Sequence, residues 1–307
     1  MRAITYSRYG GPDVLELTDQ PIPKVGADSV LVRVRAASVN PVDGYVRAGY
    51  LDGAMDVGFP AIPGWDVAGV VERVGLDTPE LQVGDEVFGY VRKDWVHGGT
   101  FAEYVSAPVR TLARKPASLS FEEAAGVPLA GLTAYQSIRR AGVQAGQTVL
   151  VHAAAGGVGS FAVQIAAALG ARVLGTASSA NHEYLRGLGA EPVEYGDGLV
   201  ERVRALAPEG VDVILHYGGT EAIATAPALL ADGGTIASIL DAAARDELGG
   251  HYVWVRPSTQ DLEALAALAD DGRLKVEIAQ VFELADTAAA HEASATGHVR
   301  GKVVVRI

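Results

Sequence analysis

A run of small residues at positions 153–159, Ala-Ala-Ala-Gly-Gly-Val-Gly, has the composition of a phosphate-binding turn. It ends a strand-forming segment, 148–153, and it precedes an apolar segment, 160–169, that indicates a helix. Such a turn lets the backbone lie against a pyrophosphate, whose charge the N–H groups and the dipole of the next helix favour. We therefore predict a dinucleotide cradle formed by Ala155, Gly156, Gly157, Val158 and Gly159.

The glycines of this turn have different expected roles. Gly156 permits close approach of the phosphates, and Gly159 lets the helix pack tightly on the strand. Ala154 occupies the position of the first glycine in a G-x-G-x-x-G pattern. We interpret Ala154 as a variant of the turn.

The segment after the second predicted strand bears on the choice of dinucleotide. An NAD enzyme usually has an acidic residue about 20 residues beyond the turn, which binds the ribose diol. Segment 175–182 has no acidic residue before Glu183, and its hydroxyl and amide groups can donate to a 2′-phosphate that a carboxylate would repel. We predict NADPH as cofactor, with candidate contacts from Ser178, Ser179, Asn181 and His182. The alternative is that these residues only cap a helix.

Composition narrows the class of protein. A chain of 307 residues is expected to form two domains. A net charge of −12 argues against nucleic acid or an anionic membrane as partner. The absence of cysteine excludes disulfides, a thiol nucleophile and Cys-ligated zinc. With no secretory leader pattern or membrane-spanning run in the sequence, we expect a cytoplasmic protein.

The pattern of elements predicts an α/β fold. Residues 1–116 contain short alternating segments separated by Gly and Pro turns, which indicates a β-rich domain. Residues 117–256 alternate apolar strands with helices, which predicts a doubly wound parallel sheet of the Rossmann type. Residues 257–307 do not continue this alternation of strands and helices, and we expect them to complete the first domain.

Several motifs follow one another in an order typical of a known superfamily. They are Asn-Pro-Val-Asp at 40–43, Pro-Gly-Trp-Asp-Val-Ala-Gly-Val-Val at 63–71, Gly-Gly-Thr-Phe-Ala-Glu-Tyr at 98–104, Leu-Thr-Ala-Tyr at 132–135, the small-residue turn, and Gly-His-Val-Arg-Gly-Lys-Val at 297–303. In these motifs the chain resembles the medium-chain dehydrogenase/reductase superfamily, and within it the zinc-independent quinone oxidoreductase (zeta-crystallin-like) branch. The resemblance implies a GroES-like substrate domain, a Rossmann domain, and a cleft between them.

The resemblance also implies roles for individual residues. Asn40, Asp43 and Tyr45 are expected at the nicotinamide end of the cleft, with Asn40 also touching the cofactor. The residues alone favour a different interpretation, in which Asn40 and Asp43 are turn and capping residues around Pro41. Further cofactor contacts are implied for Thr133, Tyr195, Arg300 and Lys302.

A proton donor is harder to assign. Enoyl reductases of the superfamily carry a tyrosine two residues after the glycine that matches Gly49, whereas here Leu51 stands there and Tyr50 precedes it. Tyr50 and Tyr45 are candidates, and water is the alternative.

The positions that hold catalytic zinc in related alcohol dehydrogenases carry Asn40, Trp65 and Leu129. None of these side chains is a good zinc ligand, so we expect a metal-free enzyme. Without a Lewis acid to stabilise an alkoxide, hydride delivery to an activated C=C bond or a quinone fits better than alcohol oxidation.

These observations predict an NADPH-dependent reductase of quinones or other α,β-unsaturated carbonyls. Two alternatives stay open, namely an enoyl or alkenal double-bond reductase of a biosynthetic pathway, and a protein that binds NADPH without turnover. Segment 251–257 reads as a sheet-edge strand, and the resemblance implies that this edge pairs in a homodimer.

Overall fold

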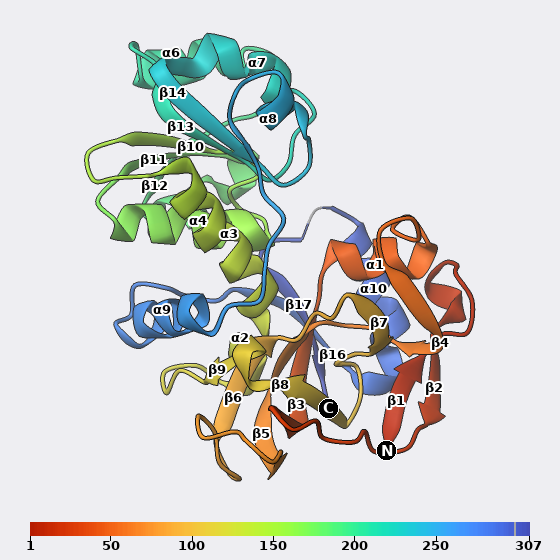
Figure 1. Cartoon of the computed structure of the whole chain (residues 1–307). Coiled ribbons are helices and arrows are strands. Elements are labelled where there is room, and N and C mark those ends of the chain that lie inside the picture. Colours follow the sequence, from red (N-terminus) through yellow and green to blue (C-terminus); the bar gives the residue numbers. More distant parts are fainter. Residues whose placement is uncertain (298) are drawn as a thin grey trace. The chain divides into compact units, whose positions relative to one another are not determined.

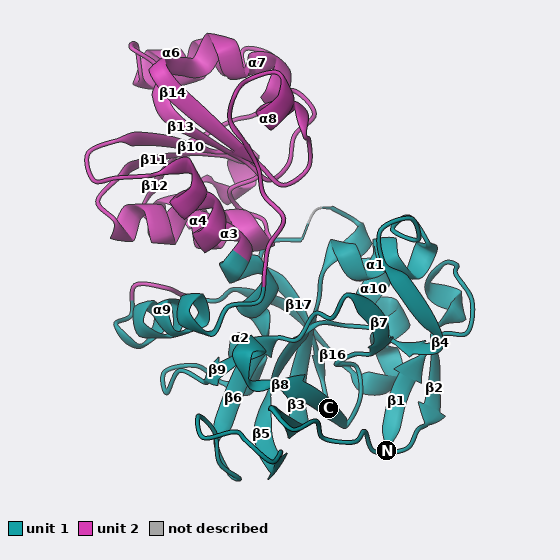
Figure 2. Ribbon diagram, viewed as in Figure 1, with its two compact units in different colours: residues 1–132, 257–272, 276–307 teal, residues 133–256, 273–275 magenta. Residues whose placement is uncertain are grey.

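The computed structural model describes residues 1–297 and 299–307, and it divides into two compact units (Figures 1 and 2). Unit 1 comprises Met1–Leu132, Pro257–Gly272 and Val276–Ile307. Unit 2 comprises Thr133–Arg256 and Arg273–Lys275. Composition groups residues 117–132 with the second domain, whereas the structure assigns them to unit 1, since helix α2 (Phe121–Gly126) packs there against strands of the unit 1 sheet.

Unit 1 is built on a mostly antiparallel sheet with the strand order β16-β17-β3-β5-β6-β9, and β8 pairs with β3. The bounds are β3 (Ser29–Val39), β5 (Asp66–Val74), β6 (Glu86–Tyr90), β8 (Tyr104–Pro108), β9 (Leu112–Arg114), β16 (Ile278–Glu283) and β17 (Lys302–Arg306). The C-terminal strand β17 lies antiparallel to β3 and parallel to β16. The last strand of the chain thus sits beside one of the first (Figure 1).

Smaller elements surround this sheet. They are β1 (Arg2–Thr5) with β2 (Glu16–Asp19), β4 (Asp56–Ile62) with β7 (Trp95–Gly98), the helices α1 (Pro41–Ala48), α9 (Thr259–Asp270) and α10 (Thr287–Ala295), and the 3-10 turns η1 (Pro12–Val14), η2 (Val109–Thr111) and η4 (Leu284–Asp286). The core is aliphatic, with Val32, Val67 and Val87 fully buried. β3 is buried at every residue except Arg33 and Arg35, and unit 1 is β-rich, as the sequence predicts.

Unit 2 is a parallel sheet with the strand order β12-β11-β10-β13-β14-β15. This is the order of a doubly wound Rossmann sheet, so the predicted fold class is confirmed. The strands are β10 (Thr148–Val151), β11 (Arg172–Thr176), β12 (Ala190–Val193), β13 (Val211–His216), β14 (Leu230–Ser238) and β15 (His251–Tyr252). The connecting elements are α3 (Pro128–Ala141), which starts in unit 1, α4 (Gly157–Ala168), η3 (Ser179–Asn181), α5 (His182–Gly187), α6 (Leu199–Leu206), α7 (Ala222–Leu229) and α8 (Ala243–Asp246).

The small-residue turn (residues 153–159) joins β10 to α4 and is tied to the end of β11. The backbone N–H of Ala153 donates to Thr176 Oγ1 at 3.1 Å, and that of Ala154 donates to the Thr176 carbonyl at 3.0 Å. A Cβ at Gly175 would lie 2.9 Å from the methyl of Ala154, so β11 can approach the turn only with glycine there. The turn is therefore held in place by its neighbouring strand.

The structure locates the unusual backbone of this turn at Ala153. Ala153 has φ 53°, in the left-handed region that costs a residue with a Cβ about 1–2 kcal/mol. Ala154 does not have positive φ, and it is fully buried. The position that favours glycine is therefore 153, one residue before the position that the G-x-G-x-x-G spacing indicates.

We expect A153G to raise the free energy of unfolding by up to about 1 kcal/mol. Release of the left-handed strain exceeds the extra chain entropy of glycine in the unfolded state, about 0.4–1 kcal/mol. The matched control is A154G, which removes a fully buried methyl from a backbone that needs no glycine and is expected to destabilise by about 1 kcal/mol. Urea unfolding of both variants measures the difference, and greater stability of A154G than of A153G would contradict the assignment.

Candidate functional site

In unit 2, the turn and the start of α4 form a surface of exposed backbone. Gly156 is the N-cap of α4, and Gly157 begins the helix. The amides of the first helical turn have no acceptor within the helix and so can donate to an anion. A Cβ at Gly159 would lie only 2.2 Å from the carbonyl oxygen of Ala153, so glycine there permits the contact between helix and turn. The free N–H groups and the absence of bulky side chains at this turn fit a dinucleotide pyrophosphate.

The candidate 2′-phosphate ligands lie together just after β11. Ser178 is the N-cap of η3, and Ser179 and Asn181 belong to that turn. Asn181 Nδ2 lies 3.4 Å from Ser178 Oγ, a long contact that leaves both groups able to bind a ligand. Nε2 of His182 is buried and has no hydrogen-bond partner among the described residues. The structure thus places the Ser178 hydroxyl next to the Asn181 amide, with Glu183 exposed on the following helix.

Tyr195 is exposed at the end of the neighbouring strand β12. Its loop is held by Arg202 of α6, whose guanidinium donates to the carbonyls of Glu194, Tyr195, Gly196 and Asp197 at 2.8–3.3 Å. Sequence reasoning missed Arg202, because an arginine at the start of a helix carries no sign of what it will contact. The clamp gives the Tyr195 loop a defined conformation.

A buried pair of histidines lies at the ends of β10 and β13. The ring centroids of His152 and His216 are 6.1 Å apart, and both rings are almost inaccessible. Burial lowers the pKa of His152 to about 4, with the nearby His216 adding to the effect. The sequence offers no signal for this pair, since a histidine at a strand end is compatible with exposure.

The tautomer of His216 follows from its contacts. His216 Nε2 lies 3.1 Å from the Gly219 carbonyl, which can only accept, so Nε2 carries the proton. Ser238 Oγ accepts from the backbone N–H groups of Leu240 and Asp241 and lies 3.1 Å from Nδ1. Its hydroxyl therefore donates to Nδ1, and the ring is neutral. Burial lowers the pKa of His216, in agreement with this assignment.

In unit 1, Asn40 and its neighbours form a buried polar cluster. Asn40 is the N-cap of α1; its Nδ2 donates to Asp66 Oδ2 at 2.9 Å, and its Oδ1 accepts from Lys302 Nζ. Asp66 also accepts from Ser38 Oγ at 2.7 Å and from the backbone N–H of Leu129 at 2.8 Å. The cluster therefore joins β3, α1, β5, α3 and β17. We call Ser38, Asn40, Asp43, Asp66 and Lys302 the Asn40 cluster.

Asp43 adds a proton-binding group to this cluster. Its Oδ2 accepts from the backbone N–H of Asn40 at 2.7 Å, which makes it the reciprocal cap of α1. Burial raises the pKa of Asp43 to about 7, and the charge of Asp66 adds to the increase, while Lys302 and Arg47 oppose it. The Asp43 carboxyl can therefore hold a proton near neutral pH. Burial also raises the pKa of Asp66 and lowers that of Lys302.

The two candidate tyrosines differ from the Asn40 cluster in their exposure. Tyr45 on α1 is 50% exposed, and Tyr50, just beyond the helix, is 79% exposed. Their ring centroids are 6.3 Å apart, and the Tyr50 backbone N–H donates to the Tyr45 carbonyl. Both hydroxyls can thus meet a substrate or water.

The remaining predicted residues are placed as follows. Thr133 is buried at the start of unit 2, and its carbonyl accepts from Ser137 Oγ at 2.7 Å. Arg300 forms an ion pair with Glu277 at 3.0 Å on the surface of unit 1. His298 of the tail motif lies outside the described residues. Lys302, for which the resemblance implies a cofactor contact, is buried in the Asn40 cluster.

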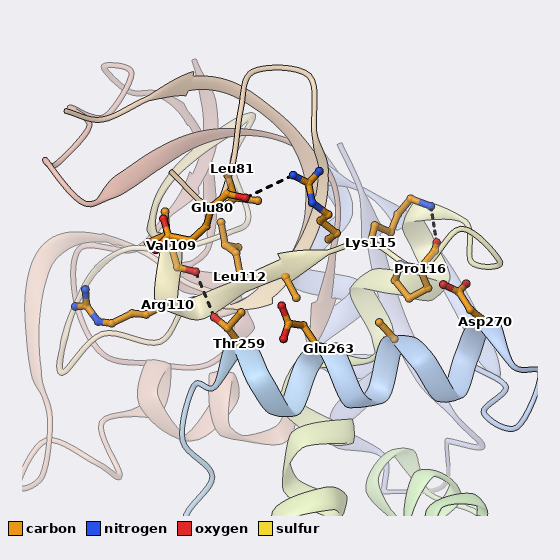
Figure 3. A pocket seen from close by; sticks show the side chains of 13 residues that line it. Glu80, Leu81, Val109, Arg110, Leu112, Lys115, Pro116, Thr259, Glu263 and Asp270 are labelled. Carbon is orange, nitrogen blue, oxygen red and sulfur yellow. Dashed lines mark hydrogen bonds between the residues drawn. The ribbon is translucent and has the colours of Figure 1, made fainter. Parts of the chain in front are cut away.

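A groove of about 540 Å³ lies elsewhere in unit 1, between β9 and α9 (Figure 3). Its cations already have partners within unit 1, because Arg110 pairs with Asp28, Arg114 with Asp85 and Lys115 with Glu86. None of the predicted site residues lines it. We do not assign the groove to the reaction.

The positions of catalytic zinc in related dehydrogenases hold no suitable ligands here. The Asn40 amide is engaged at both ends, and the Trp65 ring is buried edge-on against Tyr90. Leu129 contributes a backbone N–H and an apolar side chain. Within residues 1–297 and 299–307, no three His, Cys, Asp or Glu residues are grouped to hold a metal ion. Nor does any helix in those ranges have the length and apolarity to cross a membrane.

Comparison with known proteins places these features in a family. A family model described as "Alcohol dehydrogenase GroES-like domain" matches residues 26–117, and one described as "Zinc-binding dehydrogenase" matches residues 188–305. The chain is 35% identical to the chloroplastic NADPH-dependent alkenal/one oxidoreductase of Arabidopsis thaliana, over 99% of this chain and 79% of that protein.

Two further comparisons agree with this placement. Human quinone oxidoreductase is 33% identical, over 95% of this chain and 93% of that protein. The structure of the quinone oxidoreductase from Coxiella burnetii superposes with a TM-score of 0.89 at 34% identity, covering 100% of this chain and 99% of that one. The chain therefore belongs to the medium-chain dehydrogenase/reductase superfamily, in its quinone oxidoreductase branch.

Proposed function

We propose that this protein is an NADPH-dependent oxidoreductase that transfers hydride to quinones or other α,β-unsaturated carbonyls. The observation that carries the proposal is the β10–α4 turn beside a β11 end that presents hydroxyl, amide and imidazole groups and no carboxylate. Relatives named as quinone and alkenal/one oxidoreductases support the choice of acceptor.

The bound cofactor supplies the hydride, and the residues of this chain bind and orient it. The amides at Gly157, Val158 and Gly159 bind the pyrophosphate, with Ala155 and Gly156 leaving space for it. The 2′-phosphate end of the cofactor is bound by residues that follow β11 and β12, namely Ser178, Ser179, Asn181, His182 and Tyr195. Thr133, Asn40 and Arg300 complete the proposed cofactor contacts.

Proton handling is proposed for unit 1. Reduction of an enone or a quinone by hydride leaves an oxyanion or carbanion that must be protonated. Tyr45 and Tyr50 are exposed donors, and Asp43 holds a proton near neutral pH behind them in the protein interior. Water is the alternative donor.

We also propose that the reaction needs no zinc. One matched family model is described as zinc-binding, but an amide engaged at both ends, an indole and an isobutyl group occupy the positions of the catalytic ligands. Residues 188–305 contain no cysteine. A soft thiolate site is therefore chemically absent from this chain.

Oxidation of NADPH by a panel of quinones, simple enones and enoyl thioesters tests the function. We expect turnover with quinones or enones, and NADPH binding at least about tenfold tighter than NADH binding in fluorescence titrations. A clear kcat/KM preference for thioesters would favour the biosynthetic enoyl reductase. Binding of NADPH without oxidation by any acceptor would favour a protein that has no turnover.

The variant S178D tests the assignment of the 2′-phosphate end. A carboxylate there repels a phosphate, so the Kd for NADPH should rise by at least about tenfold, while that for NADH changes by less than about threefold. The control S7D introduces the same charge at an exposed serine of unit 1 and should leave both constants unchanged. Equal effects of S178D on the two cofactors would place the phosphate elsewhere.

We propose that the protein forms a homodimer through the edge of the unit 2 sheet. β15 is the edge strand, with only His251 and Tyr252 paired, and the adjacent Trp254 is 40% exposed. Edge strands with open hydrogen-bonding groups tend to be covered. We expect light scattering at micromolar concentration to give twice the 31.8 kDa chain mass, and a monomer mass would refute the dimer. A cytoplasmic location stays a prediction from the sequence.

A further inference from the structure

Lys302 is an unusual lysine, because its ammonium group is buried in unit 1 next to a neutral partner. It is the first residue of β17, and its Nζ donates to Asn40 Oδ1. Within the described part of the chain, no carboxylate lies within ion-pair distance of Nζ, although Asp43 and Asp66 are close enough to affect its charge. Burial of a charged group costs free energy unless the group is paired or hydrogen-bonded. The contact with Asn40 is therefore the interaction to explain.

The ammonium determines the orientation of the Asn40 amide. An ammonium has only donors and a carboxylate only acceptors, so the amide oxygen must face Lys302 and the amide nitrogen must face Asp66. The reverse orientation would bring donor against donor at Lys302 and acceptor against acceptor at Asp66. Lys302 and Asp66 thus hold one amide between them in a single orientation.

The fixed orientation of Asn40 also constrains the first turn of α1. Asn40 caps α1, and its backbone N–H is bound by the carboxyl of Asp43. Tyr45 lies on the same short helix, and Tyr50 follows it. A constraint on Asn40 is therefore a constraint on the segment that carries the proposed reacting side chains.

We propose that Lys302 is a positioning residue of the reaction, which acts through the Asn40 amide to hold the start of α1, and with it Asp43 and Tyr45, in one arrangement. The proposal rests on the proposed function. It replaces the role in 2′-phosphate binding that the resemblance implies for this lysine.

The charges around Asp43 define how Lys302 affects its protonation. Asp66 at the start of β5 is a negative neighbour, whereas Lys302 on β17 and Arg47 on α1 are positive. Tyr6 at the end of β1 and Tyr90 on β6 also face the carboxyl, and burial raises the pKa of both hydroxyls, so both stay neutral. Removal of the Lys302 charge therefore raises the pKa of Asp43.

The test is K302M, which keeps the length of the side chain and removes its charge. We expect kcat to fall at least tenfold, with the ratio of Kd values for NADPH and NADH unchanged. We also expect the limb of the kcat–pH profile that depends on Asp43 to move to higher pH. The matched control is R306M on the same strand, where an exposed arginine pairs with Glu122, and this variant should retain wild-type kinetics.

A second variant distinguishes a loss of positioning from a loss of stability. K302M leaves Asp66 without a nearby cation, whereas K302M/D66N removes both charges from the interior. If the double variant has wild-type thermal stability and a low kcat, positioning is supported. A folded K302M enzyme with wild-type kcat and pH profile would overturn the proposal. Loss of NADPH affinity alone, with kcat retained, would also overturn it in favour of phosphate binding.

Failure of the proposed function is recognised separately. If the wild-type protein does not oxidise NADPH in the presence of any of the acceptors, the proposed function is wrong. The coupling between Lys302 and Asn40 is then measured by unfolding. A double-mutant cycle of K302M and N40L should show non-additivity of at least about tenfold in the unfolding equilibrium constant. Additive effects would contradict the link between the two side chains.

Discussion

Contact between two stretches of backbone at the β10–α4 junction is the constraint on which the nucleotide-binding half depends. The carbonyl of Ala153 lies where a Cβ of Gly159 would be, so helix and turn meet without intervening side chains. That contact brings the amides of the first turn of α4 to the carboxyl edge of the sheet. The end of β11 is held at the same place by two hydrogen bonds that the backbone N–H groups of Ala153 and Ala154 donate to Thr176. The surfaces proposed for the pyrophosphate and for the 2′-phosphate thus both depend on this one close approach.

Desolvation is the equivalent constraint in unit 1. The Asn40 cluster puts an ammonium and two carboxyl groups into an interior made mostly of valine and alanine. Hydrogen bonds from Ser38, Asn40 and the Leu129 backbone satisfy Asp66, whereas Asp43 has a single backbone donor and a pKa of about 7. Burial raises the pKa of both aspartates, and the hydrogen bonds that each carboxyl accepts oppose that increase.

The classes of element were predictable from the sequence, whereas their partners were not. Alternation of apolar strands and helices over residues 117–256 predicted the parallel sheet, because burial on both faces leaves continuous apolar runs. The small-residue turn was also recognisable, because its composition is a property of consecutive residues. The pattern places its first glycine at Ala154, whereas the positive φ lies at Ala153, because motif spacing does not report φ. The contacts of Arg202 and the pairing of His152 with His216 were not predicted, since each depends on a contact formed by folding.

Local chemistry by itself determined that this chain has a dinucleotide turn, an acid-free strand end after it, and no thiol or imidazole at the positions of catalytic zinc. Those properties reside in single residues and their neighbours in the chain. Only the tertiary structure decided that Lys302 is buried and bound to Asn40, 262 positions away, and that burial raises the pKa of Asp43 to about 7. Burial and hydrogen bonding depend on which strands pack together, and β17 pairs with β3 although the two strands lie at opposite ends of the chain.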